Sequence, residues 1–187
     1  MFGSAVNRYI CAKISGMETC YILFGSNMGD KKRLFGQACS LINNRCGSIV
    51  AISSAYDSEP WGFEAEEWFL NRLVVVETCL SPDALMEQLL GIESELGRVR
   101  APERDGYASR TVDLDILYYG DRVVRTERAS VPHPRLHLRR FALLPLCELV
   151  PDMVHPVLQC TQKELLEACP DDSVVVKVED TEEQFDD

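Results

Sequence analysis

The order of its apolar segments constrains the fold of this chain more than any other feature: strand, helix, strand, strand, helix, strand. Four short runs rich in β-branched and aromatic residues have the length and composition of strands, at residues 20–24, 48–56, 70–79 and 111–119. Between them, apolar residues repeat at helical spacing after Asp30 and again after Ser81. This order predicts an α+β fold, a ferredoxin-like βαββαβ sandwich whose antiparallel sheet carries its helices on one face.

Local signals mark the first residues of the helices and the elements that come after the fourth strand. Asp30 and Ser81 have side chains that are preferred at helix N-caps. After the fourth strand we expect a short strand over residues 122–125 that pairs with it, and then a helix over residues 141–149. A last short helix begins at Thr161, which has a glutamate three residues later and so fits a capping box.

The distribution of charge divides the chain. The formal net charge is −11, from 19 basic and 30 acidic residues, and residues 171–187 alone hold eight acids and one lysine, a net of −7. We therefore expect residues 171–187 to be a solvated acidic tail, residues 1–18 a flexible extension and residues 19–170 the folded domain. An acidic chain is poorly suited to sequence-independent binding of nucleic acid, and no apolar run reaches the roughly 18 residues that span a membrane.

The eight cysteines form no C-x-x-C pair, and the first residues lack the uninterrupted apolar run of a signal peptide. We therefore expect free thiols in a reducing cytoplasm. Disulfides are the alternative, because the count is even.

Two aspartates on the fourth strand are the most informative polar residues. Because side chains alternate across a strand, Asp113 and Asp115 share one face, about 6.6 Å apart along the backbone. Carboxylates this close repel each other unless a cation or a proton intervenes, and oxygen ligands of this kind suit Mg²⁺. The alternative is an exposed polar face on an edge strand, and a lone D-x-D motif does not decide between the two.

Four arginines precede the aspartates within 13 positions: Arg98, Arg100, Arg104 and Arg110. Guanidinium groups bind phosphate through paired hydrogen bonds and keep their charge. The cluster predicts contact with a polyphosphate, and a solvated loop with local ion pairs is the alternative.

Two further segments carry candidate ligand contacts. His133 stands between two prolines and, with Arg139, could face an anion, although a single histidine is more often structural. The segment from Ser58 to Gly62, with an aromatic residue and an asparagine soon after it, could hold a planar heterocycle by ring stacking and amide pairing. A turn whose tryptophan packs on the core is the alternative.

Taken together, these segments resemble the 6-hydroxymethyl-7,8-dihydropterin pyrophosphokinase family. The matching stretches, which succeed one another in register over about residues 19–156, are residues 25–30, 54–62, 69–71, 92–98, 110–117 and 131–146. Each stretch alone is modest, and their combination carries the resemblance. Residues 104–110 and both ends of the chain depart from the family pattern.

The resemblance implies an activity. The family transfers the β,γ-pyrophosphoryl group of ATP to the hydroxymethyl group of a dihydropterin, which gives AMP and the pterin diphosphate in folate biosynthesis. Residues 55–68 and 98–109 would then be lids that exclude water from the site.

The resemblance also implies a set of site residues. Arg98, Arg100, Asp113 and Asp115 match catalytic positions, and the two aspartates match the ligands of two Mg²⁺ ions. The matching ATP-binding positions are Arg98, Arg100, Arg110, His133 and Arg139, and the matching pterin-binding positions are Ser58, Trp61, Phe69, Asn71 and Phe141. Glu93 matches a position near the nucleotide.

Two other functions stay open on the sequence. One is another Mg²⁺-dependent phospho- or nucleotidyltransferase, which would lack the pterin pocket. The other is a non-catalytic ferredoxin-like ligand-binding module, which would need neither the aspartates nor the arginines. Association with other folate-pathway enzymes is compatible with the resemblance, and partners of nucleic acid or membrane are not expected.

Overall fold

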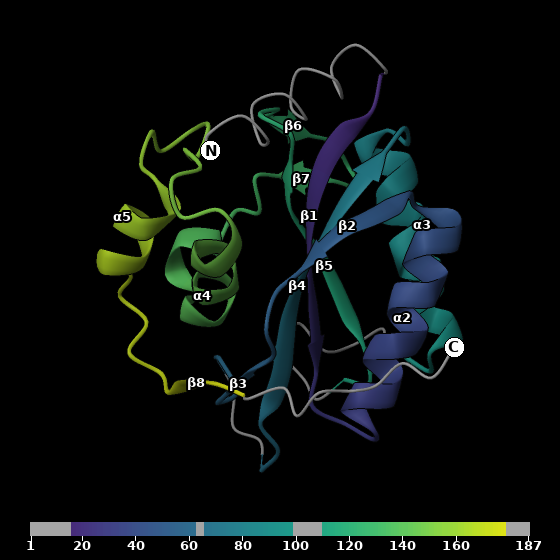
Figure 1. Cartoon of the computed structure of the whole chain (residues 1–187), viewed down its shortest axis with the longest axis horizontal. Coiled ribbons are helices and arrows are strands. Elements are labelled where there is room, and N and C mark those ends of the chain that lie inside the picture. Colours follow the sequence, from purple (N-terminus) through teal and green to yellow (C-terminus); the bar gives the residue numbers. More distant parts are fainter. Residues whose placement is uncertain (1–15, 63–65, 99–109, 179–187) are drawn as a thin grey trace, which may run out of the picture.

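The computed structural model describes residues 16–62, 66–98 and 110–178, and Figure 1 shows a central sheet with helices on both sides. The sheet has six strands in the order β5-β1-β4-β3-β8, with β2 also paired to β4, and every pair is antiparallel. Its strands are β1 (Glu18–Ser26), β2 (Ser48–Ile52), β3 (Tyr56–Ser58), β4 (Phe69–Thr78), β5 (Asp113–Tyr119) and β8 (Val175–Lys177). The helices are α2 (Lys31–Arg45), α3 (Pro82–Glu95), α4 (Arg140–Leu149) and α5 (Gln162–Glu167), with a 3-10 turn η1 (Leu136–Leu138).

The N-caps expected from the sequence are confirmed. The Asp30 carboxylate accepts a hydrogen bond from the Arg33 N–H at 3.1 Å, and the Ser81 hydroxyl accepts one from the Ala84 N–H at 3.3 Å. Thr161 begins α5 with the reciprocal bonds of a capping box. These bonds satisfy N–H groups that have no partner within the first turn of a helix.

α2 and α3, the helices of the expected βαββαβ unit, share one face of the sheet, and the additional C-terminal helices α4 and α5 cover the other, so only the expectation of a single covered face is wrong. Along β1, Ile22 and Phe24 point into a core formed with α2 and α3, whereas Leu23 points into a second core formed with α4 and α5. The difference arises in α4, which is apolar on most of its surface and buries Leu143 and Leu146 against the opposite face. Figure 1 shows α4 and α5 on one side of the strands and α2 and α3 on the other.

Three further expectations need correction. The predicted strand at residues 48–56 is two strands, because Ser53 interrupts it and exchanges hydrogen bonds with Leu73 at 2.9 Å. The strand expected at residues 122–125 does not pair with β5. Instead β6 (Val124–Arg125) pairs with β7 (Ser130–Val131), because the chain between them folds back on itself through Thr126.

The third correction concerns the acidic tail. Within it, Val175–Lys177 form β8, which pairs with β3 in the sheet, and residues 179–187 lie outside the described residues. The N-terminal residues 1–15 also lie outside them. All seven cysteines in the described part of the chain are free thiols, as expected. Over the same residues, no helix has the length and apolarity needed to cross a bilayer.

Backbone pairing lines up the residues of the candidate site. Asp113 on β5 lies opposite Gly25 on β1, and Gly25 lies opposite Asn71 on β4. A Cβ on Gly25 would lie 3.6 Å from Asn71 Oδ1 and 3.9 Å from Asp113 Cβ. Asp113, Gly25 and Asn71 therefore lie side by side on three strands, and the missing side chain of Gly25 leaves space between the Asp113 carboxylate and the Asn71 amide.

Candidate active site

The two aspartates of β5 point to the α4 side of the sheet, as the alternation of side chains predicts, and basic groups surround them. Both Arg98 and Arg110 form ion pairs with the Asp113 carboxylate. Arg139 approaches Asp115, with 3.3 Å between Nη1 and Oδ2. The acidic pair is thus balanced by guanidinium groups from three separate parts of the chain.

Buried polar groups hold two of these arginines. The Glu93 side chain is 2% exposed, and its carboxylate accepts hydrogen bonds from Arg98 at 2.6 Å and from the Leu114 N–H at 2.8 Å. Burial opposes the charge of Arg98, but attraction to Asp113 and Glu93 outweighs it and raises the Arg98 pKa. Asn27, which is buried, accepts a hydrogen bond from the Arg110 N–H at 2.8 Å. These contacts fix the side chain of Arg98 and the backbone of Arg110.

Burial sets the charge of Asp115. Loss of solvent and repulsion from Asp113 raise its pKa from 3.8 to about 6, although Arg139 and Arg110 oppose the change. The folded protein thus disfavours two full negative charges at this point of β5. A cation beside the pair would relieve that repulsion.

His133 lies next to the acidic pair in its neutral form. Its Nδ1 accepts a hydrogen bond from the Arg135 N–H at 3.2 Å, and its Nε2 lies 3.9 Å from Asp115 Oδ2. Burial, together with the positive charges of Arg139 and Arg135, lowers the His133 pKa to about 4. At neutral pH the ring therefore adds no positive charge, and the cationic partner of Asp115 is Arg139.

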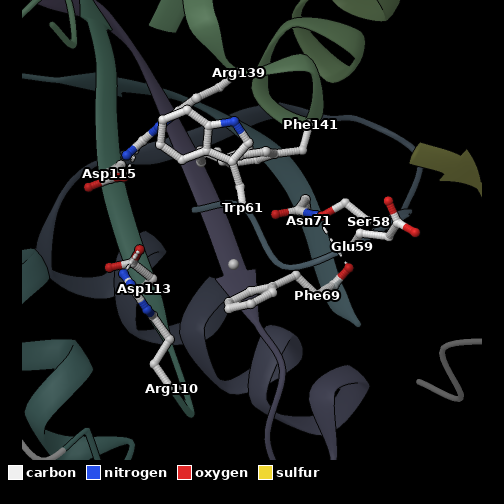
Figure 2. Close-up of a pocket in the computed structure, with 12 residues that line it drawn as sticks. Ser58, Glu59, Trp61, Phe69, Asn71, Arg110, Asp113, Asp115, Arg139 and Phe141 are labelled. Atoms are coloured by element: carbon white, nitrogen blue, oxygen red, sulfur yellow. Dashed lines mark hydrogen bonds and ion pairs between the residues drawn. The ribbon is translucent and has the colours of Figure 1, made fainter. Parts of the chain in front are cut away.

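One cavity opens on the α4 side of the sheet, and Figure 2 shows its lining. Phe69 lies across it from Trp61 and Phe141, and Asn71 stands between them. Asn71 Nδ2 donates hydrogen bonds to Ser58 Oγ at 2.9 Å and to the Tyr56 carbonyl at 3.3 Å. The lining residues are Leu23, Gly25, Ser58, Glu59, Trp61, Phe69, Asn71, Arg110, Asp113, Asp115, Arg139 and Phe141. This cavity combines aromatic faces with an amide, as expected for a site that holds a flat polar ring.

Trp61 does not stand alone on its wall. Its ring meets that of Phe141 at a centroid distance of 6.5 Å and an angle of 62°, and the Arg139 guanidinium lies 5.2 Å from the Trp61 centroid. Arg139 is only 4% exposed. Trp61 thus covers both Phe141 and Arg139, and the three side chains form one wall.

A second cavity meets the first at the acidic pair and is far more basic. It is lined by Met86, Leu90, Glu93, Arg98, Arg110, Asp113, Leu114, Asp115, Arg128, His133, Arg135 and Arg139. Asp113, Asp115, Arg110 and Arg139 line both cavities. The aspartates therefore stand where an aromatic cavity and an arginine-rich cavity join.

The structure brings together the expected site residues that it describes. Ser58, Trp61, Phe69, Asn71 and Phe141 line the first cavity, and Arg98 and His133 line the second. Arg110, Arg139 and both aspartates line the two cavities together. Arg100, and the greater part of the expected lid at residues 98–109, lie outside the described residues.

Sequence reasoning did not single out several lining residues. They are Leu23, Gly25 and Glu59 in the first cavity, and Met86, Leu90, Arg128 and Arg135 in the second. Gly25 stood at the start of a matching stretch, which was a usable signal. The arginines at 128 and 135 lie in loops, where spacing gives no indication of direction.

The donor set around the acidic pair limits what metal could bind there. Among residues 16–62, 66–98 and 110–178, no group of three or more histidine, cysteine, aspartate or glutamate side chains is arranged to hold a metal ion. Two carboxylates fit Mg²⁺, which commonly keeps water and takes further oxygen ligands from a bound phosphate. A cation at this place would also compete with Arg98 and Arg110 for Asp113.

Comparison with known proteins adds an independent line of evidence. The family model for 7,8-dihydro-6-hydroxymethylpterin-pyrophosphokinase matches residues 21–151. The 2-amino-4-hydroxy-6-hydroxymethyldihydropteridine pyrophosphokinase of Aquifex aeolicus (strain VF5) is 38% identical over 148 residues, which cover 79% of this chain and 90% of that protein. The protein of the same name from Bacillus subtilis (strain 168) is 40% identical over 130 residues, which cover 69% of this chain and 76% of the other.

Solved structures agree on the fold. The structure described as HPPK-DHPS in complex with substrates has a TM-score of 0.64 at 13% identity, and the wild-type Plasmodium falciparum HPPK-DHPS has a TM-score of 0.65 at 16%. The matches cover 81% of this chain but only 43% and 44% of those chains, so this chain spans less than half of their length.

Proposed function

Because the chain belongs to the 7,8-dihydro-6-hydroxymethylpterin-pyrophosphokinase family, we propose that it transfers the β,γ-pyrophosphoryl group of ATP to 6-hydroxymethyl-7,8-dihydropterin. The products are AMP and the pterin diphosphate, in folate biosynthesis. One observation carries the proposal: the Asp113–Asp115 pair stands where the aromatic cavity joins the arginine-rich cavity. Two substrates placed in these cavities would meet at the acidic pair.

The aromatic cavity takes the pterin ring. Phe69 and Phe141 would hold its two faces, and aromatic contacts of this kind contribute about 0.5–1.5 kcal/mol beyond the area they bury. Asn71 and Ser58 would bind its polar edge, since they are already joined by a 2.9 Å hydrogen bond. Gly25 leaves the floor open, and Trp61 keeps Phe141 and Arg139 in place.

The arginine-rich cavity takes the triphosphate. Arg98, Arg110 and Arg139 would bind phosphate oxygens, together with Arg100 from the undescribed segment, and neutral His133 could donate a hydrogen bond to them. Asp113 and Asp115 would hold two Mg²⁺ ions, which supply positive charge to the triphosphate when they are bound. The raised pKa of Asp115 supports this role, because burial and repulsion from Asp113 both disfavour its charge and a bound cation would oppose both effects.

In the reaction, the hydroxymethyl oxygen attacks the β-phosphorus in line with the leaving oxygen of AMP. The bond from the hydroxymethyl oxygen to the β-phosphorus forms, the bond from the β-phosphorus to the α,β-bridging oxygen breaks to release AMP, and the hydroxyl proton is lost to water. Arg98 and Arg110 leave Asp113 for the phosphates and offset the charge that develops on the bridging oxygens. Positioning the two substrates is the main contribution of the chain, and we assign no side chain as a dedicated general base.

We also propose a ferredoxin-like sheet for this chain, and association with another enzyme in the cytoplasm. The order β5-β1-β4-β2 supports assignment of the sheet to the ferredoxin-like arrangement. The solved HPPK-DHPS chains contain a second named part, which supports association of this chain with another folate-pathway enzyme. The free thiols of the described cysteines support a location in the cytoplasm.

The test is formation of AMP from ATP, with and without the hydroxymethyl pterin, by the wild-type chain and by D113A. We expect the wild-type chain to form AMP only when the pterin is present. D113A should form no AMP, although its cooperative thermal unfolding should show that it still folds. Turnover of ATP without the pterin would instead indicate another Mg²⁺-dependent transferase. A folded chain that binds the pterin without any turnover would indicate a binding module.

A further inference from the structure

Residues 171–178 lie beyond residues 21–151, which the family model matches, yet they contact the wall of the aromatic cavity. In this segment β8 pairs with β3, the strand that ends in Ser58. The Val178 N–H donates to the Ala55 carbonyl at 2.8 Å, and the Glu59 N–H donates to the Val174 carbonyl at 3.2 Å. These bonds lie at the two ends of β3 and fix it between β4 and β8.

The same segment holds the turn after β3. Glu59 lines the cavity, and its carboxylate accepts a hydrogen bond from the Val174 N–H at 3.1 Å. Trp61 comes two residues later and lines the same cavity. Because β3 has only three residues, its own pairing with β4 is short, and β8 supplies the second row of backbone hydrogen bonds.

At its other end the segment contacts the first turn of α4, which carries Phe141. The Asp171 carboxylate accepts a hydrogen bond from the Arg140 N–H at 2.8 Å, at the first residue of α4. An acidic group at this end of a helix is favourable, because the first N–H groups have no partner within the helix. Arg139 and Phe141, on either side of Arg140, line the cavity.

A third contact joins α4 to β3 and β8. Glu148 accepts hydrogen bonds from the Ser54 hydroxyl at 2.8 Å and from the Tyr56 hydroxyl at 2.7 Å. Lys177 of β8 lies 3.6 Å from the same carboxylate. β3 and α4, which both contribute residues to the lining of the aromatic cavity, are thus linked through residues 171–178.

We propose that residues 171–178 position β3 and α4, two elements that line the aromatic cavity, for the ring of the substrate, so that Asp171 and β8 set the affinity for the pterin without touching it. The inference rests on the proposed function, because that function places the pterin in this cavity. It assigns a positioning role to residues that the sequence predicts to be a solvated tail.

A pair of proline variants tests the role of β8 in the full chain. Hydrogen-bonded pairs alternate along an antiparallel ladder, so the bonds at Ala55–Val178 and Glu59–Val174 direct the Val176 N–H toward β3 and the Val175 N–H away from it. V176P removes a ladder hydrogen bond, whereas V175P places the same residue where no such bond is lost. We expect V176P to raise the KM for the pterin about tenfold, because the substrate must then order the wall itself, and to change kcat and the KM for ATP less than about twofold.

Substitutions at Asp171 test the contact between the segment and the first turn of α4. D171A should raise the pterin KM about threefold, and D171N should restore it, because an asparagine oxygen still accepts from the Arg140 N–H. D172A is the matched control, since Asp172 is an exposed neighbour of the same charge. If V176P does not fold, the comparison of D171A with D171N and D172A decides the matter.

The outcomes separate this inference from the function on which it rests. A wild-type chain that forms no AMP from ATP and the pterin would refute the proposed function, and this inference with it. An active wild type whose pterin KM is the same in V176P and V175P, or in D171A and D172A, would refute the positioning role alone. If a variant raised the KM for the pterin and the KM for ATP equally, the positioning role would also be refuted, because such a result would indicate general loosening of the fold.

Discussion

Replacing Asp115 by asparagine should stabilise the metal-free protein at alkaline pH while removing its activity. Asparagine has nearly the same shape as aspartate but carries no charge. In the folded protein the Asp115 pKa is raised from 3.8 to about 6 by burial and by repulsion from Asp113. The folded state therefore binds the proton more tightly than the unfolded state does. The resulting stabilisation is complete below pH 3.8 and is lost as the pH rises through 6.

The size of the effect can be worked out from the pKa and the exposure. The interval from 3.8 to about 6 corresponds to about 3 kcal/mol in full. Because 33% of the Asp115 side chain is exposed, solvent screening reduces the expected gain of D115N to about 1–2 kcal/mol at pH 8. For a chain of this length such a gain raises Tm by about 2–8 °C.

The assay is thermal and urea unfolding of wild type and D115N in the presence of a chelator, at pH 8 and pH 4. We expect the gain at pH 8 to be nearly absent at pH 4, and D152N, at an exposed position, to show no comparable dependence on pH. AMP formation by D115N should be lost, since the proposed function uses the Asp115 carboxylate to hold Mg²⁺, so stability and activity oppose each other at this position. A D115N protein that is no more stable than wild type at pH 8 would refute the account of repulsion within the pair.

Three further substitutions test other parts of the site. F141A should raise the KM for the pterin about tenfold or more and leave the KM for ATP unchanged, which steady-state kinetics would reveal, because it removes one face of the ring site. G25A should fold with nearly the wild-type Tm, since its Cβ meets Asn71 Oδ1 at 3.6 Å, yet weaken pterin binding in calorimetric titration by filling the floor of the cavity. E93Q should lower the free energy of unfolding by about 2 kcal/mol in urea and reduce turnover, because Arg98 loses a buried charged partner; unchanged stability would contradict the role given to Glu93.

Local patterns predicted the parts of the fold that depend on neighbouring residues. Alternation along β5 placed Asp113 and Asp115 on one face, and the N-cap signals at Asp30 and Ser81 were correct. The side of the sheet that α4 covers could not be predicted, because the pattern of apolar residues in a helix indicates which of its own faces is buried but not which face of the sheet it covers. The residues of the site were predicted from the combination of several motifs in the family's order. The spacing within any single motif was also compatible with a purely structural role.

Contacts between distant segments account for what the sequence did not predict. β8 has three residues within an acidic stretch, and nothing in its own pattern identifies β3 as its partner. Glu59 was not expected to line the cavity, because its position depends on the bond from Val174. The neutral state of His133 likewise depends first on burial and then on the charges of Arg139 and Arg135, and Arg139 reaches the ring only because η1 folds the chain back toward it.

The most direct test of the central claim uses Mn²⁺ in place of Mg²⁺, with a non-hydrolysable ATP analogue and the pterin. The paramagnetic ion broadens the resonances of nuclei close to it, so the 31P spectrum of the nucleotide and the 1H spectrum of the pterin report whether both substrates lie beside one cation. We expect both spectra to broaden with the wild-type chain, and both effects to disappear in the variant that combines D113N with D115N. Two results would contradict the claim that the acidic pair gathers both substrates. One is broadening that persists in the double variant. The other is a wild-type complex in which the nucleotide is bound but Mn²⁺ does not broaden the pterin spectrum.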